Sequence, residues 1–202
     1  MIRFRLVSRS CKRPSWAWAA ALIWASTAGA ASPVSPVAQD LRAELLRMKD
    51  ADQAVRDLPL TTEGEERVLS AVDAVHTARL EAIVAAHGWP TVAQVGQDGA
   101  DAAWLLAQHA DKDPAFQRSV AEAMEPLVAT GQVKASNYAY LWDRTHDPQR
   151  FGTQGRCAAK GRWEPRTVEA PEKLEERRAQ MGLTPMADYQ AMVSKHCEQF
   201  GR

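Results

Sequence analysis

Apolar residues recur at intervals of three and four over most of the chain, and this periodicity constrains the fold more than any other feature. Between positions 40 and 59 the stripe consists of Leu41, Leu45, Met48 and Val55. Such spacing places side chains on one face of an α-helix, whereas a strand needs strict alternation. The helix formers Ala, Leu, Glu, Arg and Gln are frequent, and runs of β-branched residues are absent. The sequence therefore predicts a mainly α-helical fold.

Residues that begin or stop helices divide this pattern into segments. Gly88 and Pro90 end a long amphipathic segment, and Asp113-Pro114 supplies a cap and a first-turn proline for a later one. Helices are predicted over 40–58, 61–88, 99–110, 114–131, 133–147, from about 171 and from about 184, with a turn-rich connector over 88–99. We expect six to seven helices in a single-domain bundle over residues 40–202.

A small β-hairpin is the only other predicted element. Between positions 147 and 169 the chain has three glycines and two prolines but no helical period. This composition favours a loop, and Lys160-Gly161 is typical of a tight turn between two short strands. We therefore expect one hairpin near 155–168.

The N-terminus resembles a secretory signal. Residues before the apolar run 16–28 include five basic ones and no acidic one, and the small residues Ala28-Gly29-Ala30 follow. We predict a signal peptide over 1–30, cleaved near Ala30/Ala31, and a Pro-rich spacer over 31–39. The run is shorter than the roughly 20 apolar residues that span a bilayer, so we expect no membrane span after cleavage. An uncleaved N-terminal anchor is the alternative; cleavage predicts a periplasmic or secreted protein.

Charge excludes one large class of partners. Without the signal, the chain has 20 Lys and Arg against 25 Asp and Glu, a net charge of −5. Binding to nucleic acid depends on neutralising phosphates, so we expect no nucleic-acid partner. No residue pattern indicates a cofactor, and a small molecule or a peptide is the expected partner.

Export also bears on the cysteines. Cys157 and Cys197 are the two that remain after cleavage. In an oxidising compartment two such thiols pair into a disulfide, or they stay as two separate buried thiols. A disulfide would tie the loop near position 157 to the C-terminal helix.

The strongest candidate site lies at one predicted helix end. Gln108 and His109 share the face of Leu105 and Leu106, and Asp111 follows in the tight connection. Gln117 lies beside the buried stripe of the next helix. An imidazole beside a carboxylate can serve as a general base, so His109 and Asp111 are the candidate catalytic residues. The structural alternative is that these groups bond to free carbonyl and amide groups at the helix end.

A second set of polar residues comes from other segments. Gln53 and Arg56 lie one turn apart, Asp143 and Arg144 end a helix, His87 lies near a helix end, and Gln154 follows a Gly-containing loop. An arginine beside a cavity can bind a carboxylate or phosphate through two hydrogen bonds. An intramolecular ion pair to Asp143 or Asp111 is the alternative for Arg144.

Two other kinds of active site find little support. His109, Asp111 and His87 are suitable metal ligands by type, but the chain has no HExxH motif and no paired cysteines, so we predict no metal. The mature chain also lacks G-x-S-x-G, and Ser70, Ser119, Ser136 and Ser194 lie in helical segments.

Seven short segments in this order resemble a family of uncharacterised, often exported bacterial proteins. They are DQAVR (52–56), HGWP (87–90), VG (95–96), AAWLLAQHADKDPAFQ (102–117), YAYLWDR (138–144), FGTQG (151–155) and RRAQMGL (177–183). The resemblance covers about residues 45–190 and implies no activity. It does imply that the polar positions from these segments converge on one site.

Three functions therefore compete. The first is a hydrolase with His109 as general base, Asp111 orienting it, and Arg56 or Arg144 holding an anionic group. The second is a non-catalytic module whose pocket binds a small ligand or a peptide end. The third is an interaction protein in which the polar motif only organises helix ends.

Overall fold

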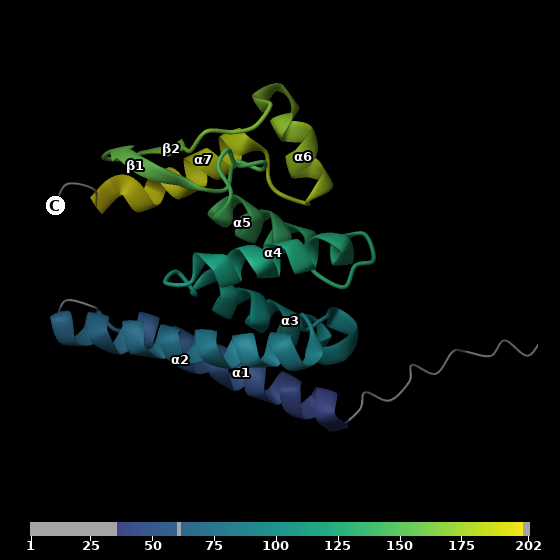
Figure 1. Cartoon of the computed structure of the whole chain (residues 1–202). Helices are drawn as coiled ribbons and strands as arrows, with labels where there is room; N and C mark the ends of the chain where they lie inside the picture. Colours follow the sequence, from purple (N-terminus) through teal and green to yellow (C-terminus); the bar gives the residue numbers. More distant parts are fainter. Residues whose placement is uncertain (1–35, 60–61, 200–202) are drawn as a thin grey trace, which may run out of the picture. The chain divides into compact units, whose positions relative to one another are not determined.

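The computed structural model describes residues 36–59 and 62–199. The predicted signal peptide, its cleavage site and residues 31–35 of the predicted spacer lie outside the described residues. Within them the chain forms seven α-helices and one two-stranded antiparallel sheet, which confirms the predicted fold class (Figure 1). No helix in the described part of the chain is long and apolar enough to cross a bilayer.

Helices α1 (Pro36–Arg56), α2 (Glu63–His87) and α3 (Val92–Gln108) pack against one another. The predicted stripe of α1 is confirmed, because Leu45 and Met48 are buried in the main core. Helix α1 begins at Pro36 rather than near Asp40, so the helix takes up the last four residues of the predicted spacer. Proline is tolerated there because the first helical N–H groups have no intrahelical acceptor.

The connector predicted over 88–99 is mostly helical, which corrects the sequence interpretation. Thr91 caps α3: its hydroxyl accepts the N–H of Gln94, and the Gln94 side chain accepts the N–H of Thr91. Gly96 then adopts a φ of 72° and kinks the helix. The kink explains the turn-like sequence, since glycine adopts positive φ without a steric penalty.

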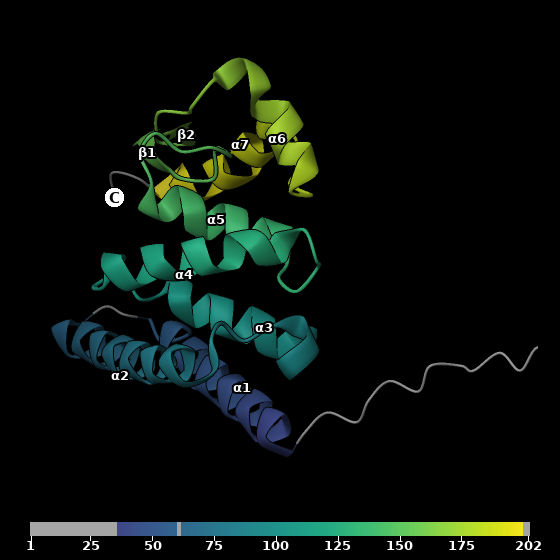
Figure 2. The same cartoon turned by 45° about the vertical axis from the view of Figure 1, so that its right-hand side comes forward.

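Helices α4 (Pro114–Val128) and α5 (Ala135–Thr145) continue the stack, and both views show α4 between α3 and α5 (Figures 1 and 2). The predicted cap is confirmed, because the Asp113 carboxylate accepts the N–H of Phe116. Tyr138, Leu141 and Trp142 are buried on one face of α5, which lies within the helix predicted over 133–147.

The C-terminal part holds the hairpin. Strands β1 (Gly155–Ala159) and β2 (Arg162–Pro165) turn at Lys160-Gly161, as predicted. The short 3-10 helix η1 (Pro171–Lys173), α6 (Leu174–Gln180), α7 (Met186–Ser194) and the 3-10 helix η2 (Lys195–Gln199) follow.

A disulfide joins the hairpin to the end of the chain. Cys157 on β1 and Cys197 on η2 form it with their Cα atoms 5.5 Å apart, which confirms the predicted pairing. Trp163 and Tyr189 are buried beside Cys197 in a second, smaller core. The disulfide therefore holds α7 and its tyrosine against the hairpin.

Candidate functional site

An aspartate–histidine pair joins two helices at the centre of the candidate site. His109 is the first residue after α3, and Asp52 lies on α1 in the same stripe as Leu45 and Met48. The Nδ1 of His109 lies 2.9 and 3.0 Å from the two carboxylate oxygens of Asp52. Because a carboxylate only accepts hydrogen bonds, we assign the imidazole proton to Nδ1. The lone pair of the neutral ring is then on Nε2.

The surroundings of Asp52 keep it charged. Its side chain is only 1% exposed, Gln53 donates a 2.8 Å hydrogen bond to it, and Arg56 lies 3.2 Å away as an ion-pair partner. Burial favours a higher pKa, but the hydrogen bonds from His109 and Gln53 and the positive charge of Arg56 outweigh it and lower the pKa of the Asp52 carboxyl. Asp52 is therefore an anionic acceptor that fixes the ring of His109.

Arg56 extends this pair into a network with α2. Its Nη2 donates a 2.7 Å hydrogen bond to Asp73. His76, also on α2, has a buried Nδ1 with no hydrogen-bond partner in the part of the chain that the structure describes. Burial is the main cause that lowers the pKa of His76, against the opposing charges of Asp52 and Asp73. Behind His109, the carboxylates of Asp52 and Asp73 are therefore paired with the guanidinium of Arg56. Burial favours the neutral form of His76.

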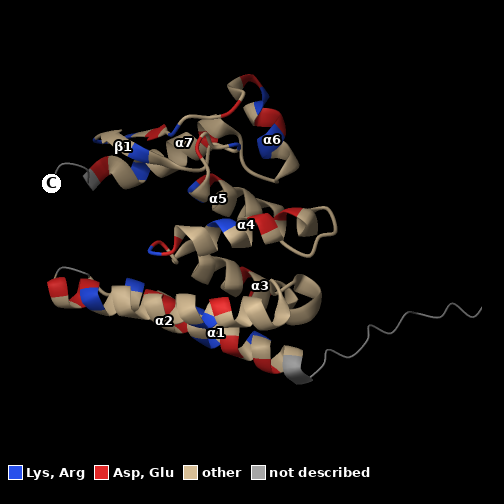
Figure 3. Ribbon diagram, in the orientation of Figure 1, with Lys and Arg blue, Asp and Glu red and all other residues tan. Residues whose placement is uncertain are grey.

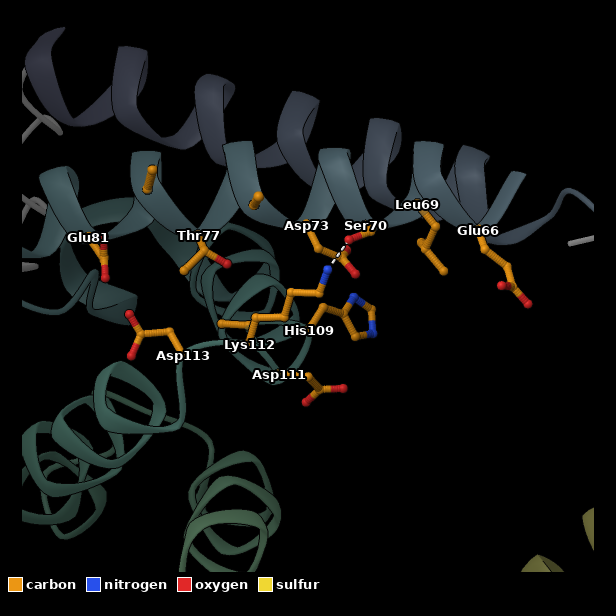
Figure 4. A pocket seen from close by; sticks show the side chains of 13 residues that line it. Glu66, Leu69, Ser70, Asp73, Thr77, Glu81, His109, Asp111, Lys112 and Asp113 are labelled. Atoms are coloured by element: carbon orange, nitrogen blue, oxygen red, sulfur yellow. Dashed lines mark hydrogen bonds between the residues drawn. The ribbon is translucent and has the colours of Figure 1, made fainter. Parts of the chain in front are cut away.

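His109 borders a first hollow of about 350 Å³, which we call the α2 hollow (Figure 4). One wall is α2 from Glu66 to Glu81, and the other is the α3–α4 connection at 109–113. Figure 4 shows one ring nitrogen of His109 turned toward α2 and the other away from it. Lys112 reaches across the hollow and donates a hydrogen bond to Ser70.

The charged residues that line the α2 hollow are mainly acidic. Its carboxylates come from Glu66, Asp73, Glu81, Asp111 and Asp113, and Lys112 is the one lysine or arginine among the described residues that line it. Figure 3 shows acidic positions both on α2 and in the connection after α3. Partial burial, a hydrogen bond with Asp113 and the charge of that residue raise the pKa of the Glu81 carboxyl. Such a surface repels a strongly anionic ligand.

His109 also borders a second hollow of about 370 Å³, which we call the aromatic hollow. Its aromatic lining residues are Trp104, Tyr140 and Tyr189, whose neighbouring ring centroids lie 6.2 to 6.4 Å apart. Gln108, His109, Arg144, Thr153 and Gln154 supply its polar side chains. None of the described residues that line it is acidic, whereas five carboxylates line the α2 hollow.

Buried polar side chains hold the loop that closes the aromatic hollow. The Asp143 carboxylate is buried and accepts the backbone N–H groups of Arg150, Phe151 and Thr153. Tyr189 donates a 2.8 Å hydrogen bond to the carbonyl of Thr153. Asp143 is therefore a positioning residue for the loop that carries Gln154.

The partner predicted for His109 needs correction. Asp111 is 60% exposed and binds Arg144 instead: the Nε of Arg144 donates a 2.9 Å hydrogen bond to it. Asp111 follows His109 by two residues in a tight turn, and its carboxylate lies on the outer side of that turn. Asp52 instead reaches the ring of His109 from the packed helix α1. The alternative ion pair for Arg144, to Asp111, is thus observed.

Seven of the other predicted residues fall into three groups, and His87 belongs to none of them. Gln108, Arg144 and Gln154 line the aromatic hollow with His109, while Gln53 and Arg56 contact Asp52 behind the ring. Gln117 and Asp143 bond to backbone: Gln117 donates to the carbonyls of Ala107 and Gln108. His87 is exposed at the end of α2 and lines neither hollow.

Several residues of the site were not predicted from the sequence. Asp52 was detectable, because it continues the stripe of Leu45 and Met48 at a spacing of four and so places a carboxylate on a buried face. Lys112, Tyr140 and Tyr189 carried no such signal, since each depends on which distant segments meet. Among the described residues, no group of three or more His, Cys, Asp or Glu side chains could hold a metal ion.

The fold and this site define a helical protein in which an acidic hollow and an aromatic hollow are both bordered by the histidine of a histidine–aspartate pair. Residues 39–198 match the model of the Family of unknown function (DUF6624), and the chain belongs to that family. The match confirms the resemblance to an uncharacterised family, while the individual motifs stay a prediction. A search of curated proteins and a search of solved structures found no match.

Proposed function

We propose that the protein is a hydrolase that acts outside the cytoplasm, with His109 as its general base. The observation that carries this proposal is the pair of contacts from Nδ1 to the buried Asp52, which leaves Nε2 without a hydrogen-bond partner among the described residues. The His109 side chain is 23% exposed and borders both hollows, so substrate and water can reach it. A histidine oriented by a carboxylate in this way is a typical general base.

The chemistry follows from these positions. A water molecule attacks the acyl carbon of the bound substrate while Nε2 takes one of its protons. The bond from that carbon to the leaving group then breaks, and the imidazolium returns the proton to the leaving group. Asp52 holds the ring and stabilises the imidazolium, and Lys112 supplies positive charge for the developing oxyanion.

Acyl compounds fit the site better than phosphate esters do. The carboxylates of the α2 hollow would repel a phosphate dianion, whereas an ester or amide is neutral at the reacting carbon. The hydroxyl of Ser70 already accepts a hydrogen bond from Lys112. We therefore assign the attack to water rather than to a serine.

The test is hydrolysis of chromogenic ester, anilide and phosphate panels by the purified protein. We expect turnover of an ester or anilide that His109→Ala lowers by about 100-fold or more. His87→Ala is the matched control, because it removes an exposed histidine that lines neither hollow. Turnover that His109→Ala leaves unchanged, or no turnover on any panel, would overturn the proposal.

A non-catalytic binding module is the second candidate. The aromatic hollow favours it, since aromatic walls with a few polar groups are typical of sites that bind small molecules or peptide ends without reaction. A ligand that raises the melting temperature without turnover would support this function. The third function, an interaction protein, is favoured by Gln117 and Asp143, which bond to backbone groups.

The proposed compartment rests on the disulfide and on the basic, then apolar, N-terminal sequence. Disulfides persist where the environment is oxidising. N-terminal sequencing of the protein from cell fractions tests it. We expect a chain that starts at Ala31 in the extracytoplasmic fraction. An intact N-terminus in the cytosol would contradict the proposal.

A further inference from the structure

We propose that the aromatic hollow binds the free carboxylate end of a short peptide or acyl amino acid, with the neighbouring acyl bond directed to His109. The placement of that bond rests on the proposed function. The carboxylate site itself rests on the hollow alone and does not require turnover.

The first support is the buried amide of Gln108. Gln108 is 8% exposed, and we orient its amide so that the oxygen accepts the N–H of Leu141 at 3.1 Å and the indole N–H of Trp104 at 3.2 Å. Because Gln108 lines the aromatic hollow, its NH₂ group can donate a hydrogen bond to a ligand oxygen there.

The second support is the guanidinium of Arg144. Its Nε and Nη2 bond to Asp111, but no partner for Nη1 is found among the described residues. Asp111 is 60% exposed, which weakens its hold on the arginine relative to a buried partner. Arg144 can therefore donate to a ligand carboxylate while its ion pair with Asp111 persists.

The difference in charged residues between the two hollows indicates how a ligand would be oriented. The aromatic hollow has Arg144 and no acidic lining residue, whereas the α2 hollow has five carboxylates and Lys112. A ligand that passes His109 would place its anionic end beside Arg144 and a neutral or cationic part over the α2 hollow. The aromatic walls favour an apolar or aromatic side chain on the residue that bears the carboxylate.

Binding of four peptides, measured by calorimetry on the purified protein, tests the proposal. The first pair is acetyl-Gly-Phe with a free carboxylate and its C-terminal amide. We expect the amide to bind about 10-fold or more weakly, because it cannot accept the charged hydrogen bond from Arg144. The second pair is Lys-Phe and Glu-Phe, of which Lys-Phe should bind more tightly. Equal binding within either pair would overturn the proposal.

Variants locate the site. Arg144→Gln should remove the preference for the carboxylate over the amide, and Arg144→Lys should restore part of it, since lysine keeps the charge but not the planar geometry. Arg156→Gln is the matched control, because Arg156 is an exposed arginine on β1 outside the hollow. A carboxylate preference that survives Arg144→Gln would contradict the assignment.

The outcomes separate this inference from the proposed function. Carboxylate-selective binding without hydrolysis would leave the carboxylate site standing and refute the hydrolase. Hydrolysis of esters or anilides together with equal binding of acid and amide would leave the hydrolase standing and refute the carboxylate site.

Discussion

Replacing Asp52 by Asn tests whether the buried carboxylate and His109 form the pair on which the site depends. Asn has the same shape but no charge, so the hydrogen bonds from His109 and Gln53 and the ion pair with Arg56 all weaken. Hydrogen bonds to a buried charge contribute roughly 1.5–3 kcal/mol each. Because Asn still accepts one of them, we expect a loss of about 3 kcal/mol in the free energy of unfolding. That corresponds to roughly 6–12 °C in melting temperature for a chain of this size.

The loss of stability caused by Asp52→Asn should depend on pH, and the direction of this dependence follows from the pKa of Asp52. The folded state lowers the pKa of this carboxyl, so its contribution is full above the pKa that it has in the unfolded chain. The contribution disappears as pH falls through the lower, folded-state pKa. Urea denaturation followed by circular dichroism should therefore give a large difference between wild type and Asp52→Asn at pH 7 and a small one in strong acid.

A double-mutant cycle isolates the contact from other effects. Asp52→Asn, His109→Gln and the double variant should give a coupling free energy of about 1–2 kcal/mol at pH 7. Asp50→Asn is the control, since Asp50 is 73% exposed on the same helix and its loss should change stability by less than about 0.5 kcal/mol. A coupling below about 0.5 kcal/mol, or a difference that does not change with pH, would refute the reasoning.

Three further predictions concern the scaffold, each measured by urea or thermal denaturation. Thr91→Ala removes the capping box of α3 and should cost about 1 kcal/mol, whereas an unchanged midpoint would mean that the cap contributes nothing. Gly155→Ala should cost about 2 kcal/mol or more, because a methyl group there collides with the carbonyl oxygen of Glu164. Loss of the Cys157–Cys197 disulfide, which lies across 40 residues, should cost about 4 kcal/mol; reductant should destabilise the wild type but not the double-serine variant.

The helices could be predicted because their signals are local. The stripe of α1, the cap at Asp113 and the turn at Lys160-Gly161 depend on residues within a few positions of one another. The start of α3 was predicted wrongly because the prediction used only local signals. Gly96 and the residues around it are typical of a turn, and only the packed core keeps the helix continuous across the kink.

The partners within the site could not be predicted, because they depend on which helices meet. His109 and Asp111 are neighbours in sequence, and that proximity suggested a pair. In the structure α1 packs against α3 and brings Asp52 to the ring, while α5 brings Arg144 to Asp111. The buried stripe of α1 did place a carboxylate on a core-facing position, so a rule that seeks charged residues on apolar faces would have found Asp52 but not its partner.

The polar residues at the end of α3 have different bonding partners. Helix ends leave carbonyl groups that need donors, and here Gln117 supplies them by bonding to the carbonyls of Ala107 and Gln108. His109 is therefore not needed for that purpose, and its Nδ1 binds Asp52 instead. The His109 side chain is 23% exposed and borders both hollows, and the role that we propose for it as a general base rests on this position.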